Sequence, residues 1–245
     1  MKFERAFNLE KSIEKNKVVV IYGPRQVGKT TLLEDYLSQT RLKYKLDSGD
    51  RLETQQILSS QNFEAIFEYA QGYELIAIDE AQHIPNIGMG LKIMVDHIKG
   101  IRIIATGSSS FQLSGQIGEP LVGRKKTVVL YPLSQIELSK INNKYELKKN
   151  LEEYLIYGSY PAVLTKKTKP EKIKTLDEII NSHLLQDILI LERVKGSKVL
   201  LDLLRLVAFQ IGGEVSLSEL GSQVGLDTKT VARYLDLFEK SFILF

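Results

Sequence analysis

The segment YGPRQVGKTT, residues 22–31, constrains the fold of this chain more than any other, because a strand-like apolar run precedes it and a helical pattern follows it. Its spacing, Gly23-x4-Gly28-Lys29-Thr30, is typical of a phosphate-binding loop. Glycines let backbone N–H groups curl around an anion, and the N-terminus of the next helix adds a favourable dipole. We interpret the segment as the phosphate-binding loop of a nucleotide site.

The loop pattern assigns roles to individual side chains. Lys29 would reach the β- and γ-phosphates of ATP, and the Thr30 hydroxyl would bind Mg²⁺. No Asn-Lys-x-Asp motif for reading guanine is present, which disfavours GTP. The residues expected to contact ATP or ADP are Gly23, Pro24, Arg25, Gln26, Val27, Gly28, Lys29, Thr30 and Thr31.

Composition excludes several other classes of protein. The 245 residues contain no cysteine, so disulfides, thiolate metal sites and cysteine nucleophiles are excluded. The histidines His83, His97 and His183 do not have metal-ligand spacing. A formal net charge of +3 is too small to indicate nucleic acid by itself. The N-terminus does not resemble a signal peptide and no apolar stretch approaches a membrane-spanning length, so we expect a cytoplasmic protein without a membrane partner.

Strand and helix patterns alternate through the first half of the chain. Strands are predicted near 18–22, 43–47, 73–78, 101–105 and 126–131. Helices are predicted near 29–38, 52–57, 62–71 and 89–99. This alternation predicts an α/β fold whose parallel sheet has helices on both faces, with ligands bound at the carboxyl ends of the strands.

The pattern changes after Pro132, where helices dominate. They are predicted near 134–139, 147–157, 170–194 and 198–211. We therefore expect a nucleotide-binding core over 1–133, a helical region over 134–205 and a C-terminal domain over 206–245.

Two acidic residues, Asp79 and Glu80, end the apolar strand "ELIAIDEAQ". Acidic side chains are costly at the end of a buried strand unless a charge awaits them. Mg²⁺ held by Thr30 would supply that charge, so Asp79 is expected to bind the metal directly or through water. Glu80 would then orient or deprotonate the attacking water. Without the phosphate loop, the alternative interpretation would be that these two acidic residues stand at the N-terminus of a helix, where negative charge is favourable.

Two further segments supply candidate residues. The strand "IRIIATGSSSF" ends in hydroxyl side chains that could hold the attacking water, with Ser108 preferred and Thr106 second; a serine helix cap is the alternative. At the start of the last strand, Arg124 could act as an arginine finger, in cis or from a neighbouring subunit, or could be an ordinary surface arginine.

The segments "VVVIYGPRQVGKTTLL", "LIAIDEAQ", "IIATGSSSFQLS", "GRKKTVVLYPLS" and "YLIYGSYPAVL" together resemble the AAA-type ATPases of archaea and bacteria, in the branch related to origin-recognition and STAND ATPases. The resemblance implies an ASCE-type core with an extra strand between the phosphate-loop strand and the Asp79 strand, a helical lid and a C-terminal winged-helix domain. It also raises Arg124 to a finger or sensor. Two departures are Gln26, where a basic residue is common, and Ser159, where the family pattern has glycine.

The end of the chain reads as helix, turn and helix, with Gly225 in the turn and Asp227 capping the second helix. Its second helix would expose hydroxyl and basic side chains to DNA, although such domains also bind proteins. The candidate DNA contacts are Thr228, Lys229, Thr230 and Arg233. The final residues 242–245 are expected to form an apolar strand, which either belongs to a longer protein or pairs with 214–216.

These features favour an ATP-hydrolysing switch in which nucleotide closes the helical region and the C-terminal domain over the site. A nucleotide-holding interaction module with little turnover and a P-loop phosphotransferase remain the alternatives. The partner of the C-terminal domain, DNA or protein, and a homo-oligomeric state stay open.

Overall fold

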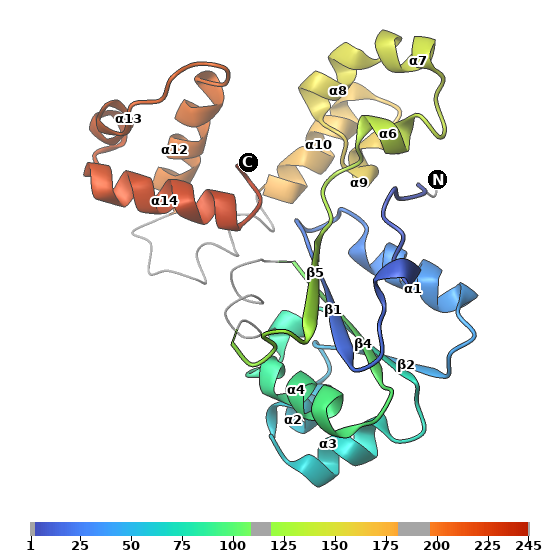
Figure 1. Ribbon diagram of the computed structural model, residues 1–245. Coiled ribbons are helices and arrows are strands. Elements are labelled where there is room, and N and C mark those ends of the chain that lie inside the picture. Colours follow the sequence, from blue (N-terminus) through green and yellow to red (C-terminus); the bar gives the residue numbers. More distant parts are fainter. Residues whose placement is uncertain (1–2, 109–118, 181–196, 245) are drawn as a thin grey trace. The chain divides into compact units, whose positions relative to one another are not determined.

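The computed structural model describes residues 3–108, 119–180 and 197–244 (Figure 1). The chain divides into two compact units, Met1–Thr175 and Leu176–Phe245, with the boundary inside one helix. The division into three parts at residues 133 and 205 stays a prediction.

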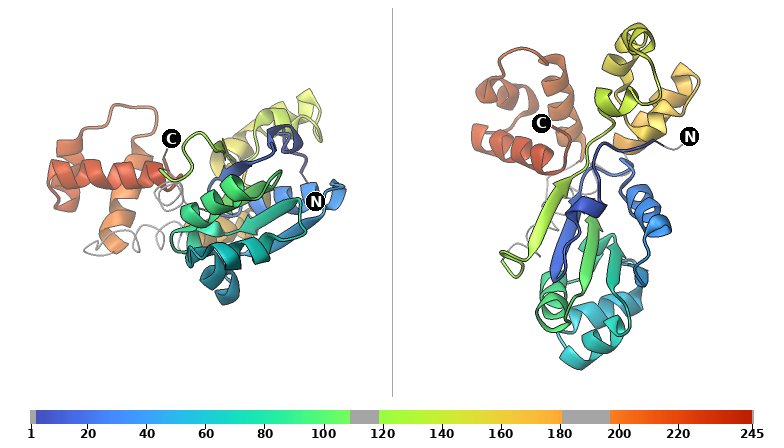
Figure 2. Two further views of the ribbon diagram at one scale, coloured as in Figure 1. Left: turned by 60° about the horizontal axis from the view of Figure 1, so that its bottom comes forward. Right: turned by 45° about the vertical axis from the view of Figure 1, so that its right-hand side comes forward.

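Five parallel strands form the centre of the first unit: β1 (Lys17–Tyr22), β2 (Tyr44–Ser48), β3 (Leu75–Asp79), β4 (Arg102–Gly107) and β5 (Lys125–Val129). Their order is β2-β3-β4-β1-β5, and every neighbouring pair is parallel. The α/β fold predicted from the sequence is confirmed. The strand β4 lies between β1 and β3, as the resemblance implied. All five strands direct their carboxyl ends to the same edge of the sheet (Figure 2).

Helices cover both faces of this sheet. On one face, α1 (Lys29–Gln39) packs Leu33 and Leu37 against Val19 and Ile21 of β1. On the other face, α4 (Ile87–His97) contacts β1 and β4, and the helices α2 (Leu52–Ser59) and α3 (Phe63–Ala70) pack on α4. Strands covered on both faces carry continuous apolar runs, which explains why β1 was predictable as a run of valines. Two 3-10 turns complete the core: η1 (Glu10–Ser12) and η2 (Ala81–His83).

Short helices follow the sheet: α6 (Gln135–Leu138), α7 (Lys144–Lys149), α8 (Leu151–Tyr157), α9 (Pro161–Leu164) and α10 (Lys169–Ile179). The helical stretch predicted near 147–157 is confirmed, but it consists of two helices with a break at Asn150. A capping box between Asn143 and Glu146 starts α7 earlier than predicted, and α8 begins afresh after Asn150. The helix predicted over 170–194 is confirmed as far as Ile179; residues 181–194 lie outside the described residues.

The second unit contains α12 (Ser197–Phe209), α13 (Leu217–Val224) and α14 (Thr228–Lys240). Gly225 ends α13 in the left-handed region with a φ of 69°, and the Asp227 side chain caps α14, as predicted. The buried core of this unit comprises Leu200, Leu203, Leu220, Val231, Tyr234, Leu237 and Phe238.

The predicted apolar strand at the end of the chain is wrong for residues 242–244, which form a helix cap instead. Phe242 has a φ of 59°, and its N–H donates to the Glu239 carbonyl at 3.0 Å. The Ile243 N–H donates to the Phe238 carbonyl at 2.8 Å. These two bonds are those of a Schellman motif, which satisfies the last carbonyls of α14. The local backbone bonds therefore prevailed over the strand propensity of this apolar run, and the described residues 214–216 form no strand either.

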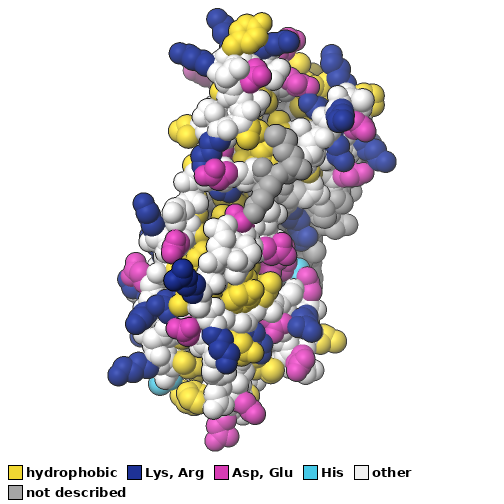
Figure 3. Space-filling model, turned by 90° about the vertical axis from the view of Figure 1, so that its right-hand side faces the viewer, with side chains coloured by type: hydrophobic (Ala, Val, Ile, Leu, Met, Phe, Trp, Pro, Cys, Tyr) yellow, Lys and Arg dark blue, Asp and Glu magenta, His cyan; other side chains and the backbone are white. Residues whose placement is uncertain are grey.

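Charged side chains are well mixed on the surface that Figure 3 shows. Lys and Arg alternate there with Asp and Glu, in keeping with the formal net charge of +3. A field of one sign would have indicated an electrostatic partner such as nucleic acid. This face therefore carries no such indication.

Candidate nucleotide site

Residues 23–31 connect the carboxyl end of β1 to the first turn of α1. Gly23 has no room for a side chain, because a Cβ atom there would meet the Leu130 carbonyl oxygen at 2.1 Å. Gly28 precedes α1 with a φ of 92°, a conformation that favours glycine. The first turn of α1 contains no acidic residue. The loop and helix start thus leave backbone N–H groups and a positive dipole end for an anion.

Lys29 is buried at the base of this loop. Its Nζ donates to the carbonyl oxygens of Gly23 at 2.9 Å and Pro24 at 2.8 Å. The ammonium group therefore lies across the loop that the sequence assigns to the phosphates.

Asp79 is the last residue of β3 and lies beside the loop, at the edge of the sheet where the strands end. One of its carboxylate oxygens accepts a hydrogen bond from the Thr30 hydroxyl at 2.8 Å, and the other accepts one from the Thr106 hydroxyl. Hydroxyl and carboxylate oxygens are the hard ligands that Mg²⁺ prefers. The donor set and its position beside the loop therefore fit this metal, with Thr30 and Asp79 as the ligands. Thr106 supports Asp79 from β4.

Glu80 follows with its backbone in the left-handed region, at φ 50° and ψ 41°. Its N–H donates to the Thr106 hydroxyl at 3.1 Å, which fixes this backbone to β4. Its carboxylate accepts a hydrogen bond from the side-chain amide of Gln82, and the same amide nitrogen lies 3.1 Å from the Ser108 hydroxyl. The structure thus brings Glu80 and Ser108 together through Gln82.

The sequence reasoning missed Gln82. It follows the acidic pair by two residues in "DEAQ", but a glutamine in that place carries no spacing signal of its own. The left-handed backbone at Glu80 and the η2 turn are what direct its side chain back toward the carboxylate.

Arg124 does not join this cluster. Its carbonyl accepts from the Val18 N–H, near the start of β1, and about 16 Å of strand separates Val18 from Gly23. Its guanidinium pairs with Asp96 near the end of α4 at 2.5 Å. Arg124 therefore lies at the edge opposite the loop, and this position does not favour a role in cis.

A pocket of about 650 Å³ lies on one side of the loop. Its walls are the N-terminal segment 3–10, the loop residues Val27 and Gly28, and the exposed face of α1. Pro161 at the start of α9 also lines it. The turn that precedes α9, in which Ser159 replaces the glycine of the family pattern, therefore reaches this pocket.

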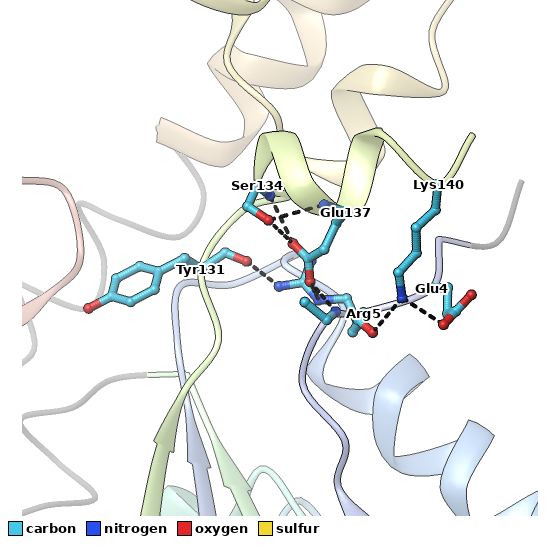
Figure 4. A network of polar contacts seen from close by, with 7 residues as sticks. Glu4, Arg5, Tyr131, Ser134, Glu137 and Lys140 are labelled. Atoms are coloured by element: carbon cyan, nitrogen blue, oxygen red, sulfur yellow. Dashed lines mark hydrogen bonds and ion pairs between the residues drawn. The ribbon is translucent and has the colours of Figure 1, made fainter. Parts of the chain in front are cut away.

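A network of polar contacts holds the N-terminal wall of this pocket (Figure 4). The Arg5 guanidinium pairs with the Glu137 carboxylate at 3.2 Å and donates to the Tyr131 carbonyl at 2.5 Å. Burial alone would raise the pKa of Glu137, but N–H groups of Ser134 and Ala6 together with the Arg5 charge lower it below its ordinary value. Desolvation lowers the pKa of Arg5, although the Glu137 charge opposes that shift. The segment before β1 is thereby fixed to α6.

A smaller pocket of about 220 Å³ lies beside Thr30 and Asp79, on the side of β2. Asp47 and Arg51 line it and pair at 3.0 Å. Burial would raise the pKa of Asp47, but hydrogen bonds from Arg51, Thr54 and Tyr69 lower it. The pocket therefore has a charged wall next to the candidate metal ligands Thr30 and Asp79.

In the second unit, the candidate DNA contacts lie along α14. Thr228, Lys229 and Arg233 are exposed, whereas the Thr230 hydroxyl donates to the Asp227 carboxylate at 2.7 Å. Thr230 is thus partly committed to the helix cap.

A family model described as an AAA domain matches residues 15–139, just over half of the chain. The chain belongs to the AAA domain family. A second model, of a domain of unknown function, matches residues 148–245. Membership and the loop geometry together make the first unit an AAA-type P-loop domain. The origin-recognition branch and the winged helix implied by the resemblance stay predictions.

Two curated relatives of this chain are longer than the chain itself. An uncharacterized protein of Haemophilus influenzae is 28% identical over 250 residues, which cover 93% of this chain and 61% of the relative. An uncharacterized protein of Methanocaldococcus jannaschii is 24% identical over 268 residues, covering 97% and 58%. The chain therefore spans about three fifths of the length of these two relatives.

Among solved structures, the Walker-type ATPase Paby2304 of Pyrococcus abyssi aligns with a TM-score of 0.57 and 16% identity, over 91% of this chain and 84% of that one. This likeness is one of fold, and it agrees with the five-stranded parallel core. Among the described residues of our chain, none of the helices is both long and apolar enough to cross a membrane.

Proposed function

We propose that the first unit binds ATP with Mg²⁺ and hydrolyses it. We propose further that this reaction changes the conformation of the helical regions that follow the sheet. The observation that carries the proposal is the meeting of the Thr30 hydroxyl and the Asp79 carboxylate at 2.8 Å, directly beside the phosphate loop and Glu80. Family membership and the fold support nucleotide binding.

Binding would use the groups on either side of the loop. The N–H groups at residues 23–31 and the Lys29 ammonium would hold the phosphates. The 650 Å³ pocket beside α1 is large enough to receive the base and ribose. Mg²⁺, when bound, would neutralise charge on the β- and γ-phosphates.

Glu80 would serve as the base for hydrolysis. The water oxygen bonds to the γ-phosphorus, the bond from that phosphorus to the bridging oxygen of ADP breaks, and the water proton passes to Glu80. Ser108, which directly follows β4, would hold the same water through its hydroxyl. The products are ADP and phosphate, so the alternative of phosphotransfer requires a small-molecule acceptor in place of water.

Lys29→Ala tests the site. We expect this variant to lose ATP binding, measured by calorimetry, and Mg²⁺-dependent phosphate release, because the phosphates lose their main cation. Lys17→Ala is the matched control: Lys17 begins β1, the strand that leads into the loop, at the opposite edge of the sheet, and pairs with Glu14 on the surface. Unchanged ATP affinity and turnover in Lys29→Ala would refute the site. Identifying the nucleotide that copurifies with wild type distinguishes ATP from other nucleotides.

The C-terminal helices would carry the output of the switch. Exposed Lys229 and Arg233 on α14 favour DNA as the partner, because a second helix of this arrangement can enter a major groove. We expect Lys229→Ala and Arg233→Ala each to weaken DNA binding and to reduce the slope of log K against log salt by about 0.9. Lys240→Ala is the control, since Lys240 pairs with Asp236 on the same helix. Wild type without DNA binding at low salt would favour a protein partner.

A further inference from the structure

We infer that Gln82 is a positioning residue that holds the Glu80 carboxylate and links it to Ser108, which directly follows β4, an inference that rests on the proposed ATP hydrolysis. Gln82 lies in the η2 turn with 5% of its surface exposed. Its amide nitrogen donates both to the Glu80 carboxylate and, at 3.1 Å, to the Ser108 hydroxyl. The two candidate groups for the attacking water thus share one amide.

The orientation of this amide follows from the chemistry of its neighbour. An ionised carboxylate can only accept hydrogen bonds, so the NH₂ end of Gln82 must face Glu80. The other end, Oε1, is then directed away from Glu80. Among the described residues Oε1 is buried and has no hydrogen-bond partner.

A buried amide oxygen without a partner is costly, so a further group that donates a hydrogen bond to it would lower the free energy of the folded state. Water is the smallest group that could satisfy Oε1, on the side of the amide that is turned away from Glu80. Gln82 would therefore hold the base with one end and accept a hydrogen bond from an ordered water with the other.

The backbone explains why Glu80 needs such a restraint. Its left-handed conformation is sparsely populated by residues other than glycine, and it is held by the bond from its N–H to Thr106. The side chain beyond Cα still has several rotatable bonds, and the hydrogen bond from Gln82 is what restricts the carboxylate. Positioning of a base to within a fraction of an ångström affects the chemical step more than ATP binding.

Two near-isosteric variants test this role. Gln82→Met keeps the volume but removes both hydrogen-bonding ends, and Gln82→Glu replaces the amide by a second carboxylate facing Glu80. We expect kcat for phosphate release to fall roughly tenfold in Gln82→Met and further in Gln82→Glu, with the KM for ATP within about twofold of wild type. The matched control is Gln223→Met, which removes a similar glutamine–glutamate contact on α13, in the second unit.

A double-mutant cycle separates positioning from general stability. If Gln82 acts through Glu80, Gln82→Met should change the residual rate of Glu80→Gln by less than about twofold. A full additional loss in that background, or equal losses of ATP affinity and kcat, would overturn the inference. Melting temperatures identify variants that fail to fold, and Gln82→Glu then provides the second measurement.

The outcomes also separate this inference from the proposed function. Wild type without ATP turnover would overturn both. Wild type that turns over ATP, with a slow Glu80→Gln and with Gln82 variants equal to wild type, would overturn the role of Gln82 alone.

Discussion

Glu80 occupies a backbone conformation that costs free energy. It follows the proposed metal ligand Asp79 in the sequence, and its carboxylate accepts a hydrogen bond from Gln82. Strained residues of this kind are retained where the surrounding contacts fix them, often at sites of chemistry. Here the Thr106 hydroxyl contributes to fixing both residues, since it accepts from the Glu80 N–H and donates to Asp79. One buried hydroxyl thus sets the relative position of the proposed base and the proposed metal ligand.

Glu80→Gln should separate binding from chemistry. The amide keeps the shape of the side chain but cannot take a proton, so ATP should still bind while phosphate release slows by roughly a hundredfold or more. Calorimetry gives the affinity and a coupled phosphate assay gives the rate. Equal rates in wild type and variant would contradict the catalytic role of Glu80. Phosphate found on a small molecule instead of in solution would support the phosphotransferase alternative.

At the scale of elements, local signals made the core predictable. The strands β1, β3 and β4 are apolar runs, and the loop after β1 carries its own spacing motif, so the sheet and its ligand-binding edge followed from the sequence. The C-terminal residues 242–244 were mispredicted because a helix cap, formed by backbone bonds, does not depend on the apolar side chains that suggested a strand.

Contacts between distant residues were not predictable in the same way. Arg5 and Glu137 lie far apart in the sequence, and neither has a neighbour that marks it as a partner. Their pairing arises from the return of the chain beside the sheet after β5. Gln82 was missed for a related reason, because its role depends on the turn that follows β3 and on β4.

The link between the N-terminal segment and α6 predicts a dependence of stability on pH. The pKa of Glu137 lies below its ordinary value of 4.5 in the folded protein, so ionised Glu137 stabilises the fold above that value. This contribution should be lost as the pH falls through the lowered pKa. Glu137→Gln breaks a buried pair and should lower the free energy of unfolding at pH 7 by roughly 3 kcal/mol, and with it the melting temperature. The difference in melting temperature from wild type should shrink as the pH falls.

Melting curves between about pH 7 and pH 3 measure this effect. Glu4→Gln is the matched control, because Glu4 belongs to the same segment and pairs with Lys140 at 2.6 Å, but its side chain is 78% exposed. An exposed ion pair contributes little to stability, so the melting temperature of Glu4→Gln should equal that of wild type at every pH. A constant difference between Glu137→Gln and wild type across this range would contradict the assigned role.

At the scale of the whole molecule, the distance between Arg124 and the phosphate loop bears on assembly. Arg124 lies at the amino ends of the strands, at the opposite edge from its own loop, and its side chain is 41% exposed next to Asp96. A neighbouring subunit of a homo-oligomer could bring its own loop to this edge. We therefore propose that any role of Arg124 as an arginine finger is exerted in trans.

This proposal predicts that activity depends on assembly. Turnover per subunit should rise with the concentration of wild-type protein, and this rise should be absent in Arg124→Ala, whose ATP affinity should equal that of wild type because its own loop is intact. Asp96→Ala is the control: it removes the partner of Arg124 and leaves the guanidinium in place, so it should retain the rise.

Mixing two inactive variants gives the decisive measurement. Arg124→Ala subunits have an intact loop but no finger to offer, whereas Lys29→Ala subunits have a defective loop and an intact Arg124. In a mixed oligomer, a Lys29→Ala subunit can supply the finger to the loop of an Arg124→Ala neighbour, so phosphate release should return. Each variant alone should stay inactive at the same total concentration. If the mixture is no more active than its components, sites are not shared between subunits, and Arg124 is a surface residue paired with Asp96.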